Sequence, residues 1–235
     1  MGQGVFLVTG AGRGIGAATA RLAAEAGYRL VLTARDTASL AELAARLGGP
    51  DRVWVASCDV RVYEQLAALM GQVEEEWGSL DVVFANAGAS VTTSFTSTDG
   101  APPAEWSDMV LTNVCGPAFT ARAAMPALMR HAGHLVLTGS AAGRGVRPGN
   151  LYSATKWAVT GLAQAIRAEC VGTGVRVTLV QPGLTDTGGI PPSRAGDPKL
   201  APEDVARAVL YAVSQPPNVD VNEILVRPVG QDAYR

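Results

Sequence analysis

The chain contains only two lysines, Lys156 and Lys199, beside seventeen arginines, and Lys156 follows Tyr152 by four residues. A lysine kept in a chain that otherwise uses arginine indicates a task for a compact point charge, which shifts the pKa of a neighbouring group. If residues 151–171 are helical, both side chains lie on one face. The ammonium should then lower the phenol pKa from about 10 toward neutrality, so that Tyr152 exchanges protons near physiological pH. The alternative is a surface pair on an ordinary helix, which the motif alone does not exclude.

A second group of residues with chemical potential follows the first apolar run. After Thr9 comes a glycine-rich turn, and the residues from 14 onward have helical character. The turn comprises Gly10, Gly12, Arg13, Gly14, Ile15 and Gly16. Glycines let the backbone approach a ligand, and the free N–H groups at a helix start favour an anion. The order strand, glycine turn, helix predicts a pyrophosphate site, although the Gly-x-x-x-Gly-x-Gly spacing differs from the usual dinucleotide motif.

The end of the second predicted strand bears on which dinucleotide binds. An NAD-selective site places an acidic residue there to hold the ribose 2′-hydroxyl, but this chain has Ala34 followed by Arg35. Together with Arg13, two cations and no carboxylate predict a 2′-phosphate and hence NADP(H), with NAD(H) less favoured. The alternative is that Arg35 points to solvent and Asp36 takes the acidic role one position later.

These residues require a scaffold in which strands and helices alternate. Strands are predicted at 4–9, 29–33, 53–57, 81–84, 133–138, 175–181 and 222–227. Helical patterns lie at 14–26, 37–47, 61–77, 104–130, 151–171 and 202–214. Several strands are nearly continuous in Val, Leu and Phe, as in strands buried on both faces. The fold class is therefore α/β: a single-domain, Rossmann-type, doubly wound parallel sheet of about seven strands with helices on both faces, over residues 1–235.

Length and composition limit the remaining possibilities. The 235 residues suffice for one large domain. A net charge of −2 and the absence of any Lys/Arg run argue against nucleic acid or an anionic membrane as a partner. No apolar stretch approaches the roughly 18 residues that span a bilayer. With no leader before the first strand, we expect a cytoplasmic protein. The three scattered cysteines should be small buried residues in a reducing compartment.

Metal and nucleophilic-serine chemistry are not expected. His131 and His134 fall near the end of the 104–130 helix, without an acidic or cysteine residue at metal-ligand spacing, so we interpret them as a solvated helix end and predict no metal site. Gly139-Ser140 is not a Gly-x-Ser-x-Gly elbow, which argues against a hydrolase.

Taken in order, these segments resemble the short-chain dehydrogenase/reductase family along nearly the whole chain. Residues 9–16 match the family's Thr-Gly-x-x-x-Gly-x-Gly cofactor loop, and Tyr152 with Lys156 matches its Tyr-x-x-x-Lys pair. Further matches, in chain order, are Asp59 and Val60 at the adenine, Asn86, Ala87 and Gly88 after the fourth strand, Asn113 and Ser140 as catalytic positions, and Pro182, Gly183, Thr185 and Thr187 at the nicotinamide. Ala85 departs from the family's usual Asn at a structural contact.

The resemblance implies an oxidoreductase that interconverts a small carbonyl compound and its alcohol. Tyr152 would donate the proton, Lys156 and the positive nicotinamide ring would stabilise the phenolate, Ser140 would orient the carbonyl, and Asn113 would hold a water that links Lys156 to solvent. The segment 202–228 looks like that of relatives acting on 3-hydroxy acids and related alcohols. The alternative function is a non-catalytic NADP-binding sensor or scaffold, which would have no need of a tuned phenol.

Two segments interrupt the alternation of strands and helices. Residues 89–103 and 184–200 are rich in turn-forming residues, and we expect the second to close over the substrate. Arg144, Arg147 and Arg194 lie in loops that could border the pocket and bind a substrate carboxylate; surface exposure is the alternative. Apolar faces on the helices 104–130 and 151–171 indicate a homodimer or homotetramer, although those faces could be buried within one subunit.

Overall fold

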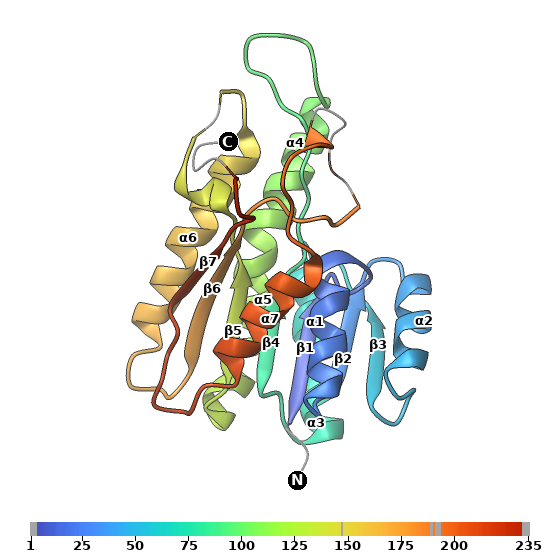
Figure 1. Ribbon diagram of the computed structural model, residues 1–235. Helices are drawn as coiled ribbons and strands as arrows, with labels where there is room; N and C mark the ends of the chain where they lie inside the picture. The colour runs from blue at the N-terminus through green and yellow to red at the C-terminus, as the bar shows by residue number, and fades with distance from the viewer. Residues whose placement is uncertain (1–3, 147, 189, 191–193, 232–235) are drawn as a thin grey trace.

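A parallel sheet forms the middle layer of the molecule, with the strands in the order β3-β2-β1-β4-β5-β6-β7 (Figure 1). The computed structural model describes residues 4–146, 148–188, 190 and 194–231. The strands are β1 (Val5–Thr9), β2 (Arg29–Ala34), β3 (Val53–Ser57), β4 (Val82–Ala85), β5 (His134–Thr138), β6 (Arg176–Pro182) and β7 (Glu223–Val226). All seven predicted strands are confirmed, and their ends differ from the prediction by one residue at most.

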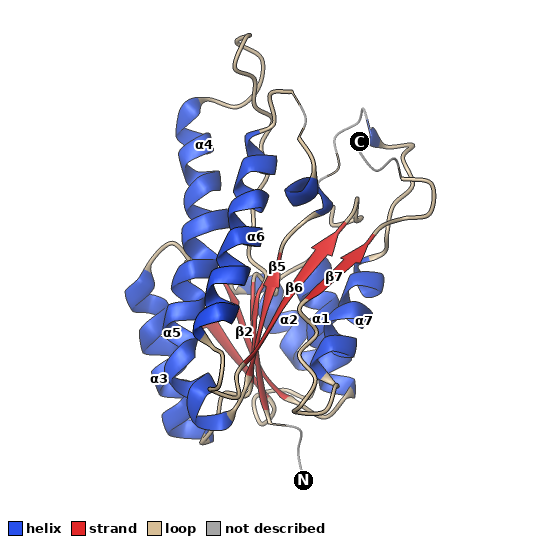
Figure 2. Ribbon diagram, turned by 90° about the vertical axis from the view of Figure 1, so that its left-hand side faces the viewer, coloured by secondary structure: helices blue, strands red, loops and turns tan. Residues whose placement is uncertain are grey.

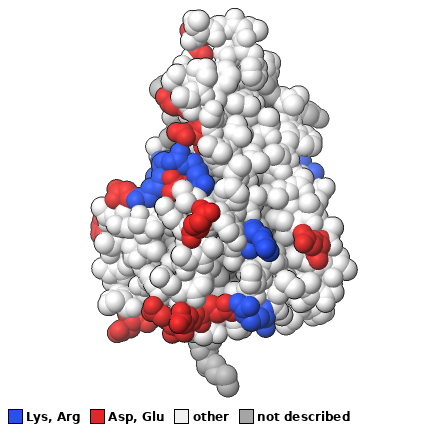
Figure 3. Space-filling view, turned by 180° about the vertical axis from the view of Figure 1, so that it is seen from behind, with Lys and Arg blue, Asp and Glu red and all other residues white. Residues whose placement is uncertain are grey.

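Helices cover both faces of this sheet, as predicted. They are α1 (Gly14–Glu25), α2 (Ala38–Arg46), α3 (Tyr63–Trp77), α4 (Pro103–Val110), α5 (Gly116–His131), α6 (Leu151–Glu169) and α7 (Pro202–Val213). Figure 2 shows α1 and α7 on one side and α3, α5 and α6 on the other. Figure 3 shows the face of the molecule that is covered by α3, α5 and α6. Much of this face carries few charged side chains, apart from a basic cluster and an acidic row along the lower edge.

Two apolar cores fill the spaces between the sheet and its helix layers. Successive residues of a strand face opposite sides, so Val5 and Leu7 contribute to one core and Phe6 and Val8 to the other. All four are fully buried. This explains why the strand sequences are continuously apolar instead of alternating.

The predicted helix at 104–130 is instead two α-helices joined by a π-helical turn, η1 (Leu111–Cys115). Asn113 lies in this turn, is 1% exposed, and its side-chain amide exchanges hydrogen bonds of 2.8 Å each with the backbone N and O of Ala89. A buried amide bonded to a separate segment favours a local widening of the helix, and such π turns are frequent at functional sites.

The strand order places a crevice above β1 and β4, where the chain connections leave in opposite directions. In open α/β sheets ligands bind at this position, outside the carboxyl ends of the strands. The segments after β1, β4, β5 and β6 all meet there. In the described part of the chain, no helix has both the length and the apolarity to cross a bilayer.

Candidate active site

The glycine turn after β1 has a shape that side chains would prevent. Gly10 and Gly14 adopt φ of +66° and +54°, the left-handed region that favours glycine. A Cβ on Gly16 would lie 2.4 Å from the Gly10 carbonyl oxygen and 2.7 Å from Asn86 Nδ2. The turn therefore keeps its backbone close to the end of β4.

Helix α1 starts in a way that suits an anion. It has no side-chain N-cap and no acidic residue in its first turn. Its first N–H groups and its positive dipole end are therefore available to a ligand charge. The residues present fit the pyrophosphate of a dinucleotide.

Thr9 connects this turn to the end of β4, a role that the sequence analysis did not assign to it. Its Oγ1 accepts hydrogen bonds from the backbone N of Asn86 at 3.0 Å and of Ala87 at 3.1 Å. In return Asn86 Nδ2 donates to the Thr9 and Gly10 carbonyls at 3.0 and 3.3 Å. Thr9 is the first residue of the cofactor-loop motif, and this position in the motif is the sequence feature that could have indicated its role. Asn86 and Ala87 are thus fixed against the glycine turn.

The side chains expected at the adenosine end lie at the same edge of the sheet. Arg35 is exposed, and the Asp36 carboxylate accepts a 2.9 Å hydrogen bond from Ala38 N at the start of α2. Arg13 is also exposed, and its Nη1 donates to the Thr187 carbonyl at 3.2 Å.

Asp59 has a partner that the sequence did not predict. Arg61 binds its carboxylate through Nε at 3.0 Å and Nη2 at 2.7 Å, and reaches Asp108 with Nη1 at 2.8 Å. The hydrogen bond from Arg61 is the main reason that the Asp59 pKa lies below its usual value. Val60 is buried against Gly116, where a Cβ would lie 2.9 Å from Val60 Cγ2.

Tyr152 and Lys156 lie together on α6. Lys156 is 4% exposed, its Nζ donates to the Thr138 carbonyl at 2.9 Å, and Nζ lies 5.6 Å from the centroid of the Tyr152 ring. Burial lowers the pKa of Lys156 to about 8. Burial also raises the pKa of Tyr152, an effect that the hydrogen bond with Ser140 opposes. The predicted fall of the phenol pKa is therefore wrong for the protein alone, because loss of solvent outweighs the hydrogen bond with Ser140.

Ser140 stands where β5 ends and faces this pair. Its Oγ accepts a 3.1 Å hydrogen bond from Ala142 N and so caps the short 3-10 turn η2 (Ala141–Arg144). Its hydroxyl lies 3.5 Å from the Pro182 carbonyl and bonds to the Tyr152 phenol. The capping bond occupies an oxygen lone pair and so does not compete for the O–H, whose hydrogen bond to the Pro182 carbonyl is long at 3.5 Å.

Asn113 reaches the same cluster through a neighbour of Lys156. Its Nδ2 donates to Thr155 Oγ1 at 3.1 Å. A Cβ on Gly88 would lie 3.4 Å from Asn113 Oδ1 and 3.8 Å from Lys156 Nζ. The structure thus brings Gly88, Asn113 and Lys156 together.

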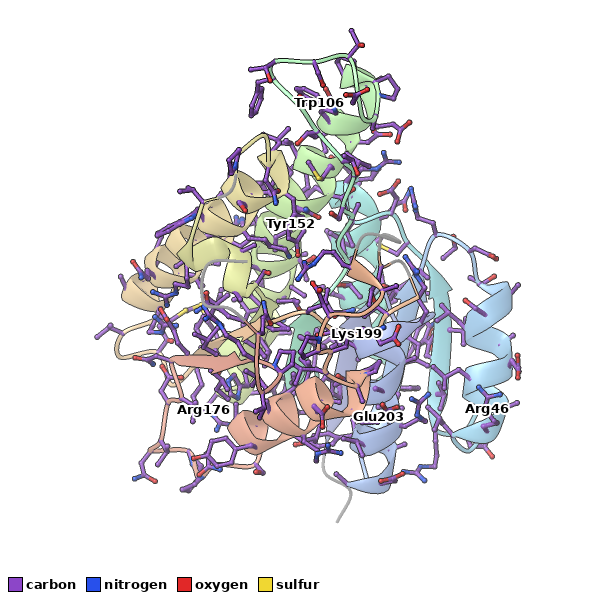
Figure 4. All side chains as sticks on the ribbon, turned by 45° about the horizontal axis from the view of Figure 1, so that its top comes forward. Arg46, Trp106, Tyr152, Arg176, Lys199 and Glu203 are labelled. Atoms are coloured by element: carbon purple, nitrogen blue, oxygen red, sulfur yellow. The ribbon has the colours of Figure 1, made fainter. Side chains whose placement is uncertain are left out.

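A cleft of about 830 Å³ opens beside Ser140 and Tyr152. In the view of Figure 4, Tyr152 lies between Trp106, at the outer end of α4, and Lys199. The cleft is bounded by Ile15, residues 90–93, 138–142, 148–150, 182–185 and 187, and by Arg194 and Gln231. It therefore joins Ile15 of the glycine turn and the predicted nicotinamide segment to Ser140 and Tyr152.

The three candidate arginines behave differently. Arg194 lines the cleft, with its Nε bonded to Asp197 at 2.8 Å. Arg144 is engaged with Gln181 and Glu223 instead. Arg147 lies outside the described residues.

Thr93 is a cleft residue that the sequence analysis did not single out. Its Oγ1 donates to the Gly149 carbonyl and accepts a 3.0 Å bond from Leu151 N, the first residue of α6. It therefore ties the 89–103 segment to the start of the helix that carries Tyr152. Nothing in the local sequence signals this contact, because it joins segments 58 positions apart.

The interpretation of both histidines as a solvated helix end is wrong for His134. This residue begins β5, is fully buried, and places Nε2 2.7 Å from Thr178 Oγ1 on the neighbouring strand. Burial lowers its pKa to about 3. His131 does end α5, where it lies 3.4 Å from Glu74.

Comparisons with known proteins agree on one family. A family model described as short chain dehydrogenase matches residues 4–197. An uncharacterized oxidoreductase of Staphylococcus aureus (strain MRSA252) is 39% identical over 228 residues, which cover 96% of this chain and 97% of the relative.

Two solved structures are similar over almost the full length. An alcohol dehydrogenase from the archaeon Thermococcus sibiricus, complexed with 5-hydroxy-NADP, is 31% identical with a TM-score of 0.87 and covers 97% of each chain. The closed form of a serine dehydrogenase complexed with NADP+ is 31% identical with a TM-score of 0.88, covering 97% of this chain and 96% of the other.

Proposed function

Because the chain belongs to the short-chain dehydrogenase/reductase family and is an oxidoreductase of the CH–OH group, we propose that it uses NADP(H) to interconvert a small carbonyl compound and its alcohol, with Tyr152 as the acid and base. The observation that carries this proposal is that Tyr152 and Ser140 line one cleft beside the glycine turn, with Lys156 Nζ 5.6 Å from the Tyr152 ring centroid. A sensor or scaffold would not require this arrangement.

Tyr152 and Ser140 divide the work at the carbonyl oxygen. The Ser140 hydroxyl, fixed by Ala142 N, donates a hydrogen bond that orients the carbonyl and stabilises the charge that develops on it. Tyr152 transfers its phenolic proton to the same oxygen during reduction and takes it back during oxidation. When bound, the cofactor supplies or accepts the hydride, and its oxidised ring adds positive charge beside the phenol.

Lys156 and Asn113 support the proton transfer. With a pKa of about 8, Lys156 is still mainly an ammonium at neutral pH and favours the phenolate over the phenol. Asn113 holds the Ala89 backbone and Thr155 in place beside it. We propose that a water bound near Asn113 returns the proton from solvent through Lys156.

The preference for NADP(H) is supported by charge. Arg13 and Arg35 are both exposed, Ala34 carries no carboxylate, and Asp36 is already bonded to the α2 backbone. A 2′-phosphate would release Arg13 from the Thr187 carbonyl and gain charge-assisted hydrogen bonds. Both similar structures described above contain an NADP-type cofactor.

The substrate is small, because the 830 Å³ cleft must hold the nicotinamide as well. One of the similar structures is a serine dehydrogenase, and Arg194 places a cation at the cleft. We therefore propose a 3-hydroxy acid or a related alcohol, with the segment 184–200 closing over it. An anionic group on the substrate would face Arg194.

We propose that the protein assembles through the outer face of α6. Ala154, Trp157, Ala158, Gly161 and Ala165 are exposed along this helix, on the side of the molecule that carries few charges in Figure 3. Small exposed residues permit close helix packing across a two-fold axis. Light scattering on the purified chain should give the mass of a dimer or tetramer; a monomer at micromolar concentration would contradict the assembly.

The decisive experiment is turnover by Tyr152→Phe. NADPH absorbance is followed with a panel of aldehydes, ketones and oxo acids, and the best substrate is retested with the variant. We expect kcat to fall at least about a thousandfold, since the general acid is lost, while the Kd for NADPH changes less than about threefold. Full activity of the variant would refute the mechanism, and no turnover with any carbonyl compound would refute the proposed activity.

A further inference from the structure

Three side chains beneath Ser140 form a closed ring of hydrogen bonds. Arg144 Nε donates to Gln181 Oε1 at 3.1 Å, Gln181 Nε2 donates to Glu223 Oε2 at 3.3 Å, and Arg144 Nη2 forms an ion pair with that same carboxylate oxygen. Each comes from a different element: η2, β6 and the edge strand β7. We call Arg144, Gln181 and Glu223 the Arg–Gln–Glu triad.

One member of the triad is buried and the other two lie at the surface, where the side chains of Arg144 and Glu223 are 36% and 27% exposed. Gln181 is 1% exposed, so its amide needs both partners. Glu223 pairs with Leu179 across β6 and β7, which makes it the diagonal neighbour of Gln181 on the same face. A buried amide whose oxygen and nitrogen are both bonded fixes one orientation of its side chain, because reversal would put donor against donor.

The triad contacts the backbone that leads into Ser140. A Cβ on Gly139 would lie 3.0 Å from Gln181 Cγ, so the Gln181 side chain packs directly against this residue. One turn later, a Cβ on Gly143 would lie 2.7 Å from the Lys156 carbonyl oxygen. The η2 turn is thus held between the triad on one side and the backbone of α6 at Lys156 on the other.

We infer that the Arg–Gln–Glu triad consists of positioning residues that set the Ser140 hydroxyl relative to the Tyr152 phenol. Arg144 is the last residue of η2, and Ser140 caps the first turn of the same element through Ala142 N. Release of Arg144 from Glu223 lets η2 move as a unit, and Ser140 moves with it. The inference rests on the proposed function, within which Ser140 orients the carbonyl.

A purely structural role is the competing explanation, in which the triad only attaches the edge strand β7 to the sheet. The two roles differ in whether the effect of a triad substitution on activity depends on Ser140. A positioning role acts through Ser140 and vanishes when Ser140 is absent, whereas loss of β7 attachment reduces activity by the same factor in either background.

The test is a double-mutant cycle of Arg144→Met with Ser140→Ala, read as kcat for carbonyl reduction. We expect Arg144→Met to lower kcat about tenfold in the wild-type background and less than about twofold in the Ser140→Ala background. Glu223→Gln, which keeps the size of the side chain, should reproduce both results if Arg144→Met folds poorly. Arg207→Met, which breaks an exposed ion pair with Asp204 on α7, is the matched control and should leave kcat unchanged. Equal factors in both backgrounds would overturn the inference.

A second measurement does not depend on turnover. The hydrogen bond from Ser140 lowers the pKa of Tyr152, so misplacement of Ser140 raises it. The phenol titration is followed by absorbance as the difference between each variant and its Tyr152→Phe counterpart. Arg144→Met should raise the Tyr152 pKa, and should not do so when Ser140 is alanine. If Arg144→Met raises the Tyr152 pKa but the wild-type protein reduces no carbonyl compound, the positioning role holds and the proposed function is refuted. If Arg144→Met leaves the Tyr152 pKa unchanged, the positioning role alone is refuted.

Discussion

We expect the buried ammonium of Lys156 to reduce the stability of the folded protein. Lys156 is 4% exposed, and its ammonium donates a hydrogen bond to the Thr138 carbonyl at 2.9 Å. Burial lowers its pKa from the ordinary 10.5 to about 8. At about 1.4 kcal/mol for each pKa unit, the charged form disfavours folding by roughly 3 kcal/mol at neutral pH. We therefore predict that Lys156→Met raises stability while it abolishes turnover.

The gain in stability from Lys156→Met becomes smaller as the pH rises. The folded-state pKa is below the unfolded-state value, so between about pH 8 and pH 10.5 the unfolded chain binds more protons and wild-type stability rises with pH. Methionine keeps an unbranched stem of similar length but leaves the Thr138 carbonyl without its donor, at about 1 kcal/mol. The net gain of Lys156→Met is then about 2 kcal/mol at pH 7 and close to zero near pH 9.5.

The assay is calorimetry without cofactor at pH 7 and pH 9.5, in a Tyr152→Phe background so that the adjacent phenol does not titrate. For a chain of this length, about 2 kcal/mol corresponds to a Tm increase of about 4–8 °C at pH 7. Groups elsewhere titrate equally with and without Lys156→Met, so the difference in stability between the two proteins reports the titration of Lys156. A variant that is less stable at pH 7, or a difference that stays constant with pH, would refute the reasoning.

Two further predictions concern the cofactor and the cleft wall. Arg13→Ala and Arg35→Ala should each raise the KM for NADPH about tenfold with little change in the KM for NADH, because each removes a charge-assisted bond to a 2′-phosphate. Steady-state kinetics with both cofactors check this. Equal increases in the two KM values would contradict the preference for NADP(H). Thr93→Val, which removes both bonds to the start of α6, should raise the KM for the carbonyl substrate about tenfold, whereas Thr93→Ser keeps both bonds and should stay within about twofold. Equal KM values for the two Thr93 variants would exclude the positioning role of this residue.

Much of the fold follows from the order of the residues alone. Short apolar runs such as Val5–Val8 and Leu30–Leu32 suit strands buried on both faces, and their alternation with helical segments indicates a parallel sheet. The glycine turn is equally local, since Gly10 and Gly14 need positive φ whatever surrounds them. The family resemblance assigned Ser140, Tyr152 and Lys156, and the structure places Ser140 and Tyr152 at one cleft with Lys156 beside Tyr152.

The tertiary structure decided what depends on solvent and on distant partners. The charge of Lys156 is visible in the sequence, but burial sets its pKa and reverses the expected shift at Tyr152. Arg144 reads as a candidate for substrate, yet Glu223, 79 positions later in the chain, engages it. His134 looks like a helix-end residue until Thr178 is seen beside it. Local spacing determines which groups exist and on which face they lie; only packing determines how much water each one loses and which partner replaces it.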